Sequence, residues 1–235
     1  MKAMIKIIRW TDIPTVISSP YAYPILAKMK NDKIRKREEV ANAVTHGIGA
    51  ALALAGVIIL IIQVEAKALP GFMIYGLSLE LLYLASTVYH SVTNPRKKLL
   101  FKKLDHMAIF ILIGGTYTPF CLSALPGWPG WALLAGVWGL AAAGILFKAF
   151  YTGRHEAISI MLYIATGWLV IAAIKPIYES LSGLGFTLLI LGGLLYSAGV
   201  IFYLSRRIRY NHAIWHLFVL GGSSFHFFSV MTLNA

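Results

Sequence analysis

Three histidines and one aspartate stand where hydrophobic segments of this chain begin or end. His90 closes one segment, Asp105 opens the next, and His212 and His216 open the last. If the chain crosses a bilayer at each segment, all four side chains fall at one membrane face, a few residues inside it. Imidazole and carboxylate groups bind transition metals, so this pattern predicts a metal site.

The spacing of these residues favours zinc. His212 and His216 are four residues apart, as are Ser86 and His90, which places each pair on one face of a helix. Two imidazoles at this spacing can bind one ion, and His90 adds a third. Three protein ligands with an open fourth position are typical of catalytic Zn²⁺. As alternatives, intramembrane histidines can bond across helices, Asp105 can cap a helix, and Ser86 can serve helix packing.

Composition places the chain among membrane proteins. Of its 235 residues, 58% are hydrophobic and only 13% are charged, against about 25% charged in soluble domains. Seven apolar stretches have about the 20 residues that a helix needs to cross the hydrocarbon core. The predicted fold is therefore all-α, an integral membrane bundle of seven transmembrane helices. The expected spans are 40–62, 71–91, 106–125, 131–150, 157–174, 184–204 and 212–233.

The net charge of +12 is explained by topology rather than by nucleic-acid binding. Of the 21 Lys and Arg residues, all but Lys67 and Lys175 lie in the N-terminal arm or in connections on the same side of the membrane. The positive-inside rule then predicts a cytoplasmic N-terminus and an outside C-terminus, with the metal site near the cytoplasmic face. We therefore expect a multi-pass protein of the cell membrane that binds no nucleic acid.

The chain is expected to have two parts. Residues 1–37 are basic and contain Pro14, Pro20 and Pro24, which predicts an arm at the cytoplasmic interface with one short amphipathic helix. Residues 38–235 form the transmembrane domain. The start lacks the apolar run and cleavage site of a secretory signal peptide, so we expect it to be retained. Pro119, which follows two glycines inside the third span, predicts a kink.

The polar positions fall in short strings of sequence, which read Ser86-Thr-Val-Tyr-His90, Lys103-Leu-Asp105-His106, Gly115-Thr-Tyr-Thr-Pro119, His212-Ala-Ile-Trp-His216 and Glu39-x-x-Asn42-x-x-x-His46. These strings resemble those of the bacterial hemolysin III family. That family lies within the wider progestin and adipoQ receptor group, which includes the adiponectin receptors, and it is similar to the alkaline ceramidases. The resemblance covers about residues 38–232.

The resemblance implies a seven-helix fold with an intramembrane zinc ion near the cytoplasmic side. Carried over to this chain, His90, His212 and His216 would bind the metal. Asp105 would hold the water bound to the metal, and Ser86 would stand beside it. Members of the group resemble receptors, cytolysins and lipid hydrolases, so the resemblance leaves the activity open.

The remaining polar residues are expected to lie outside the first coordination sphere. His46 can be a fourth ligand or an interhelical hydrogen-bonding residue. His106 points about 100° around the helix from Asp105, and His226 lies about 21 Å from His212 along the last helix, too far to share its ion. Glu80 lies deeper in the membrane, where we expect it to be protonated or hydrogen-bonded.

Three functions compete at this point. The first is zinc-dependent hydrolysis of a lipid amide, in which Asp105 accepts a proton from water and Ile109, Leu112 and Thr116 line a cavity for the lipid tail. The second is a receptor or membrane-organising protein in which zinc only ties helices together. The third is a pore-forming cytolysin, against which the scarcity of polar residues beyond the cytoplasmic third argues. The lipid partner and the oligomeric state stay open.

Overall fold

The computed structural model describes residues 22–205 and 207–234, and those residues are helical apart from short connections. The chain divides into two compact units, Met1–Glu39 and Val40–Ala235. The first helix of the described part, α2, runs from Ala22 to Gln63, so residues 22–37 of the arm belong to a long helix. The short amphipathic helix expected in the arm stays a prediction. Pro24 lies in the first turn of α2, where a helix tolerates a proline because that N–H has no helical partner. The predicted division at residue 37 stays a prediction, and residues 1–21 lie outside the described part.

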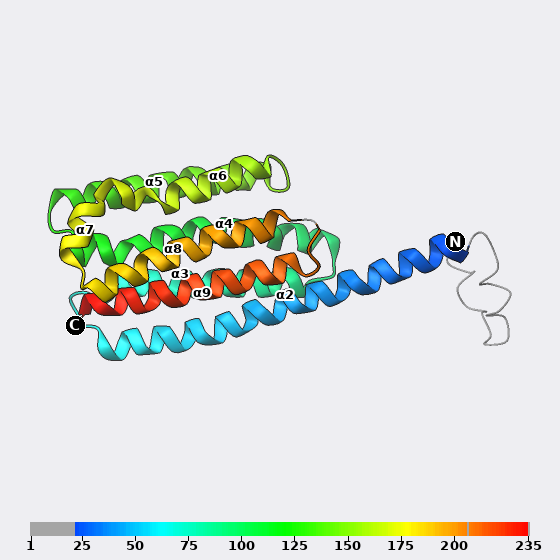
Figure 1. Ribbon diagram of the computed structural model, residues 1–235, viewed down its shortest axis with the longest axis horizontal. Coiled ribbons are helices and arrows are strands. Elements are labelled where there is room, and N and C mark those ends of the chain that lie inside the picture. Colours follow the sequence, from blue (N-terminus) through cyan, green and yellow to red (C-terminus); the bar gives the residue numbers. More distant parts are fainter. Residues whose placement is uncertain (1–21, 206, 235) are drawn as a thin grey trace. The chain divides into compact units, whose positions relative to one another are not determined.

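Seven segments of the described chain are long and apolar enough to cross a membrane, which confirms the predicted all-α fold with seven spans. Their membrane orientation stays a prediction. After α2 the helices follow one another through short turns (Figure 1). They are α3 (Leu69–Ser91), α4 (Pro95–Pro119) with the π-helix η2 (Phe120–Ala124), α5 (Trp128–Tyr151), α6 (Glu156–Gly167) with the 3-10 helix η3 (Leu169–Ala173) and α7 (Ile174–Ser180), α8 (Gly183–Leu204), α9 (Asn211–Met231) and η4 (Thr232–Asn234).

Helix α4 begins well before the residue that the sequence indicates as its start. The Asn94 side chain accepts hydrogen bonds from the backbone N–H groups of Arg96 and Lys97, at 3.0 and 3.2 Å, and Pro95 occupies the first turn. Asparagine before proline is a strong helix start. The basic segment that follows is therefore helical, and Asp105 lies inside α4 rather than at its first turn.

The third and fifth spans both change helix type along their length. At Pro119, where the sequence predicts a kink, α4 gives way to the π-helical residues of η2. The fifth span is broken into α6, η3 and α7, which the sequence does not predict. Tyr117 of α4 stabilises this break: its hydroxyl donates to the Gly167 carbonyl and accepts from the Val170 N–H, both at 2.7 Å. A side chain from another span thus satisfies backbone groups that the break leaves open.

The bundle buries large aromatic side chains at its centre and exposes aliphatic ones. Helix α3 packs along α4, and α8 packs along α9. Tyr75 and Tyr83 of α3 and Phe110 of α4 are almost completely buried. Large apolar residues such as Ile62, Phe150 and Ile201 are exposed on the outside, which suits contact with lipid chains.

Candidate metal centre

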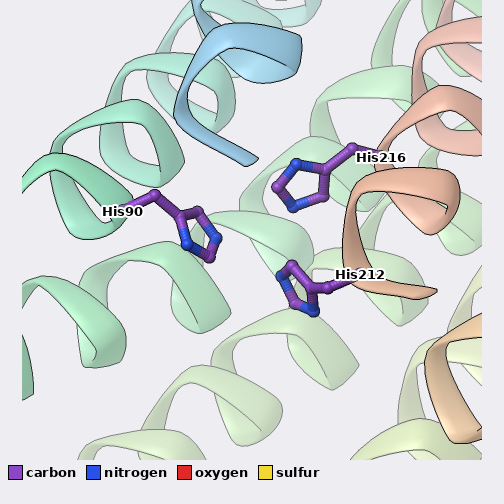
Figure 2. Close-up of side chains that lie close together, drawn as sticks. All are labelled: His90, His212 and His216. Atoms are coloured by element: carbon purple, nitrogen blue, oxygen red, sulfur yellow. The ribbon is translucent and has the colours of Figure 1, made fainter. Parts of the chain in front are cut away.

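Three histidines meet between the end of α3 and the start of α9. His90 lies in the last turn of α3, and His212 and His216 lie in the first two turns of α9. One ring nitrogen from each histidine lies within 4.8 Å of the other two. Figure 2 shows the three rings around a shared space, with one nitrogen of each ring turned towards it. The structure therefore brings together the three residues that the sequence predicts as ligands, in a group that can hold a metal ion.

The rings surround a point instead of stacking on one another. Their centroids are separated by 5.0 Å between His90 and His212, 5.2 Å between His90 and His216, and 4.6 Å between His212 and His216. The planes of each pair are inclined by 59° to 67°. His216 is fully buried and His90 is 6% exposed. Neutral imidazoles in a buried group of this shape offer lone pairs to one cation.

Hydrogen bonds from α2 orient the ring of His216. Its Nδ1 lies 3.0 Å from the Thr45 hydroxyl oxygen and 3.3 Å from the Asn42 carbonyl oxygen. A carbonyl oxygen only accepts, so Nδ1 carries the hydrogen and Nε2 keeps its lone pair. Nε2 is buried and has no hydrogen-bond partner among the described residues. The chemistry of this donor set fits a metal, because Nδ1–H bonded to an oxygen is the usual support of a ligating histidine.

His46 of α2 lies against the metal centre without joining it. Its ring stacks on that of His216, with centroids 3.5 Å apart and planes inclined by 14°, and its edge meets Tyr83. Among the described residues it is not part of the group of converging nitrogens. His46 therefore packs against His216, and the alternative of a fourth protein ligand receives no support.

Asp105 and Ser86 form a second buried pair, outside the histidine group. Asp105 is 5% exposed and Ser86 is fully buried. The Ser86 hydroxyl lies next to the Asp105 carboxyl, although its geometry does not meet that of a hydrogen bond. His106 also lies next to Asp105, with 3.6 Å between its Nδ1 and the Asp105 Oδ2. The same Nδ1 donates to the Lys102 carbonyl at 2.8 Å. The roles of Asp105 and Ser86 stay predictions.

A cavity of about 150 Å³ reaches His46, the ring that stacks on His216, but none of the three converging histidines lines it. Asp105 and His46 line one part of it, and Ile109, Leu112 and Thr116 continue its wall along α4. The three α4 residues are those that the sequence predicts for a tail cavity. The rest of the wall comes mostly from apolar and aromatic residues of α6, α8 and α9. The cavity therefore joins a buried carboxyl group to an apolar space.

Several polar residues near the site carry no recognisable sequence signal. Thr45 supports His216, but a threonine in a helix is common and its partner lies 171 residues away. Lys148 of α5 is fully buried and donates to Glu156 at 3.1 Å. Neither residue's place in the sequence indicates this pairing. Asn42 lies on the polar face of α2 that the sequence does show, and its amide lies 3.4 Å from Nδ1 of His90.

The fold and the histidine group define a multi-pass helical membrane protein with a candidate metal centre between its spans. Residues 34–227 match the family described as Haemolysin-III related. Hemolysin-3 of Bacillus cereus is 54% identical over 199 residues, which are 83% of this chain and 91% of the relative. The Hemolysin-3 homolog of Bacillus subtilis is 50% identical over 199 residues, 83% of this chain and 93% of the relative. The human Monocyte to macrophage differentiation factor is 29% identical over 167 residues, 67% of each chain. The chain belongs to the haemolysin-III related family.

Proposed function

We propose that this protein is a zinc-dependent hydrolase of the cell membrane that cleaves an amide bond in a lipid. The observation that carries the proposal is the presence of three converging histidine nitrogens together with a mostly apolar cavity, which is lined by Asp105 and by His46, the neighbour of His216. Three imidazoles suit zinc and leave a coordination position open, since the fourth polar neighbour, His46, stacks on a ligand and does not join the group.

The chain's own residues divide the work of hydrolysis. His90, His212 and His216 would hold the ion, and Asp105 would accept a proton from the attacking water and return it to the leaving nitrogen. Water and amide then become a carboxylic acid and an amine. Ser86, next to Asp105, would donate a hydrogen bond to the developing oxyanion. When bound, zinc supplies a Lewis acid that polarises the carbonyl and lowers the pKa of a coordinated water towards about 7.

The position of the cavity supports a lipid substrate. Ile109, Leu112 and Ile113 form an apolar wall beyond Asp105, where an acyl chain can lie. The polar head of the same molecule would stay near the basic, cytoplasmic face. A site a few residues inside the bilayer suits a molecule that is polar at one end and apolar at the other.

Metal analysis of the purified protein tests the site. We expect about one zinc ion per wild-type chain and none in His212→Ala/His216→Ala. His155→Asn is the matched control, because His155 is exposed and has φ 52°, a conformation that asparagine tolerates. Zinc retained by the double variant, or lost equally by the control, would contradict the proposed ligands.

Turnover of lipid amides by purified protein tests the catalysis. We expect product release by the wild type and a loss of at least about 100-fold in Asp105→Asn, which keeps the shape of the side chain but cannot take up the proton. Zinc content is measured in the same samples, so that a lost metal is distinguished from a lost base. Equal rates in wild type and variant would remove Asp105 from the mechanism.

A structural zinc in a non-catalytic receptor is the second candidate, favoured by the position of the ligands in different helices. On this hypothesis zinc ties α3 to α9. Histidine substitution would then lower the melting temperature, and no lipid product would form with any amide or ester that the cavity can hold.

A pore-forming cytolysin is the third candidate, and the name of the Bacillus cereus relative, Hemolysin-3, favours it. The wall of the cavity is mostly apolar, which argues against a continuous aqueous pore because such a pore needs a polar lining. Dye release from liposomes decides this point: leakage that persists in a variant lacking all three ligand histidines would support pore formation independent of the metal centre.

A further inference from the structure

The mostly apolar cavity ends at a histidine that the proposed chemistry does not use. His226 of α9 is 9% exposed and lines both the cavity that adjoins Asp105 and a smaller one of about 40 Å³ beyond it. Ten residues separate it from His216, which places it about 15 Å away along the helix. The ring is therefore far from the metal centre, at the junction of two spaces that an acyl chain can fill.

The hydrogen of the His226 ring can be assigned from its contacts. Its Nε2 lies 3.0 Å from the carbonyl oxygen of Leu189 in α8. Because a carbonyl only accepts, Nε2 carries the hydrogen, and Nδ1 is left with a lone pair. Nδ1 is buried and has no hydrogen-bond partner in the described chain. Burying an acceptor without a donor costs free energy. An O–H or N–H group of a bound molecule would remove this cost by donating a hydrogen bond to Nδ1.

Close packing against α8 fixes the direction in which this lone pair points. The ring edge formed by Cδ2 and Nε2 lies against Gly192, where a Cβ atom would overlap it. Nδ1 is the ring vertex opposite that edge, so it faces away from the α8 backbone. The ring of Tyr196 packs against the His226 ring, with their centroids 5.4 Å apart, and limits rotation of the His226 ring.

The other polar groups on the cavity wall near His226 are engaged with the protein, whereas His46, on the part of the wall near Asp105, has no hydrogen-bond partner among the described residues. Thr116 donates its hydroxyl hydrogen to Leu112, and Ser197 donates to Gly193 while accepting from Trp168. At this end of the cavity, Nδ1 of His226 is the one ring or side-chain nitrogen of the described residues that is buried without a partner. At this end the hydroxyl groups already take part in hydrogen bonds, and the His226 nitrogen is an acceptor that does not.

We propose that the cavity selects acyl chains that carry a hydroxyl group within the chain, and that this hydroxyl donates a hydrogen bond to Nδ1 of His226. The proposal rests on the proposed function for the direction of the lipid, with its head group at Asp105. The chain beyond the hydroxyl continues into the smaller cavity, which is lined by Phe120, Ile177 and Leu189. His226 is then a specificity residue that does not touch the reacting atoms.

Binding of free fatty acids to the zinc-loaded protein in detergent tests the proposal, with displacement of a fluorescent polyene fatty acid as the readout. The three ligands are stearic acid, stearic acid hydroxylated about two thirds of the way along the chain, and stearic acid hydroxylated next to the carboxyl group. We expect the second ligand to bind about tenfold more tightly than the other two, the equivalent of one buried hydrogen bond. Equal affinity of all three for the wild type would overturn the proposal without any variant.

Two variants assign the preference to this side chain. His226→Phe should bind all three fatty acids equally. Ser229→Ala is the matched control, because Ser229 also bonds an α8 carbonyl, that of Gly185 at 2.6 Å, but does not line either cavity. A preference that survives in His226→Phe would overturn the proposal. Because the assay measures binding without turnover, it can be interpreted even if the protein does not hydrolyse lipids. If the protein hydrolyses lipid amides but binds the three fatty acids equally, only the proposed role of His226 is refuted.

Discussion

The hydrogen on each imidazole decides which of its nitrogens can bind a metal. For His216 the oxygens of Thr45 and Asn42 hold that hydrogen at Nδ1. For His90 the neighbour of Nδ1 is the side-chain amide of Asn42, 3.4 Å away, whose oxygen has no partner among the described residues. Turning this amide by 180° places its oxygen against Nδ1, which would then carry the hydrogen and free Nε2 for the ion. In that orientation one asparagine of α2 would hold both His90 and His216, the first through its side chain and the second through its backbone.

We expect Thr45→Val to weaken zinc binding by about tenfold, because the ring of His216 loses one of the two oxygens that orient it. Valine keeps the size of threonine, so helix content should stay unchanged. Thr187→Val is the control, because the hydroxyls of Thr45 and Thr187 both donate to a carbonyl four residues back, and Thr187 lies on an exposed face of α8. Titration of the metal-free proteins with zinc measures the effect. Identical zinc affinities for Thr45→Val and wild type would show that the Asn42 carbonyl alone is enough to orient the His216 ring.

The glycines of α5 show how closely this element approaches its neighbour. At Gly144 a Cβ atom would overlap the ring of Phe110 in α4, which is completely buried, whereas at Gly139 nothing lies within 4 Å of the same atom. We expect Gly144→Ala to destabilise the protein by about 1 to 3 kcal/mol, since neither helix can yield without strain. Gly139→Ala should be neutral or slightly stabilising because alanine favours the helix. Thermal unfolding in detergent compares them, and a similar loss in both variants would contradict this account of the packing.

Helices α5 and α6 are also joined by a buried cation. The Lys148 ammonium is fully buried and donates to the Glu156 carboxylate at 3.1 Å, and the latter is 36% exposed. We expect Glu156→Gln to cost about 1 to 3 kcal/mol, because the cation loses its counter-charge but water still reaches the pair. Lys148→Met/Glu156→Gln should recover most of this loss. Thermal unfolding of the two variants measures it, and a double variant less stable than Glu156→Gln would show that Lys148 has another function.

At the scale of the whole molecule, the sequence predicts what depends on one segment at a time. Seven apolar runs and the spacing of His212 and His216 are local patterns, and the structure confirms both. The break in the fifth span depends on Tyr117 of another helix, and the burial of Lys148 depends on Glu156 across a turn. Such features arise from contacts between segments, which a hydrophobicity pattern does not contain. The start of α4 is a different case, because Asn94 and Pro95 do carry a local signal for it.

The charge distribution predicts the orientation of the whole bundle, and single cysteines can test this prediction. Lys67 and Lys175 are the two basic residues expected outside, and a hydrogen bond to Glu65 raises the pKa of Lys67, which therefore stays charged. Cys121 is the only cysteine and is buried, so the wild type should not react with a membrane-impermeant maleimide. We expect Lys67→Cys to be labelled in intact cells and Lys97→Cys only after permeabilisation, because both positions are exposed but lie at opposite membrane faces. Labelling of Lys97→Cys alone in intact cells would show that the bundle has the opposite orientation. The histidine cluster would then lie at the outer face, and a lipid substrate would have to come from the outer leaflet.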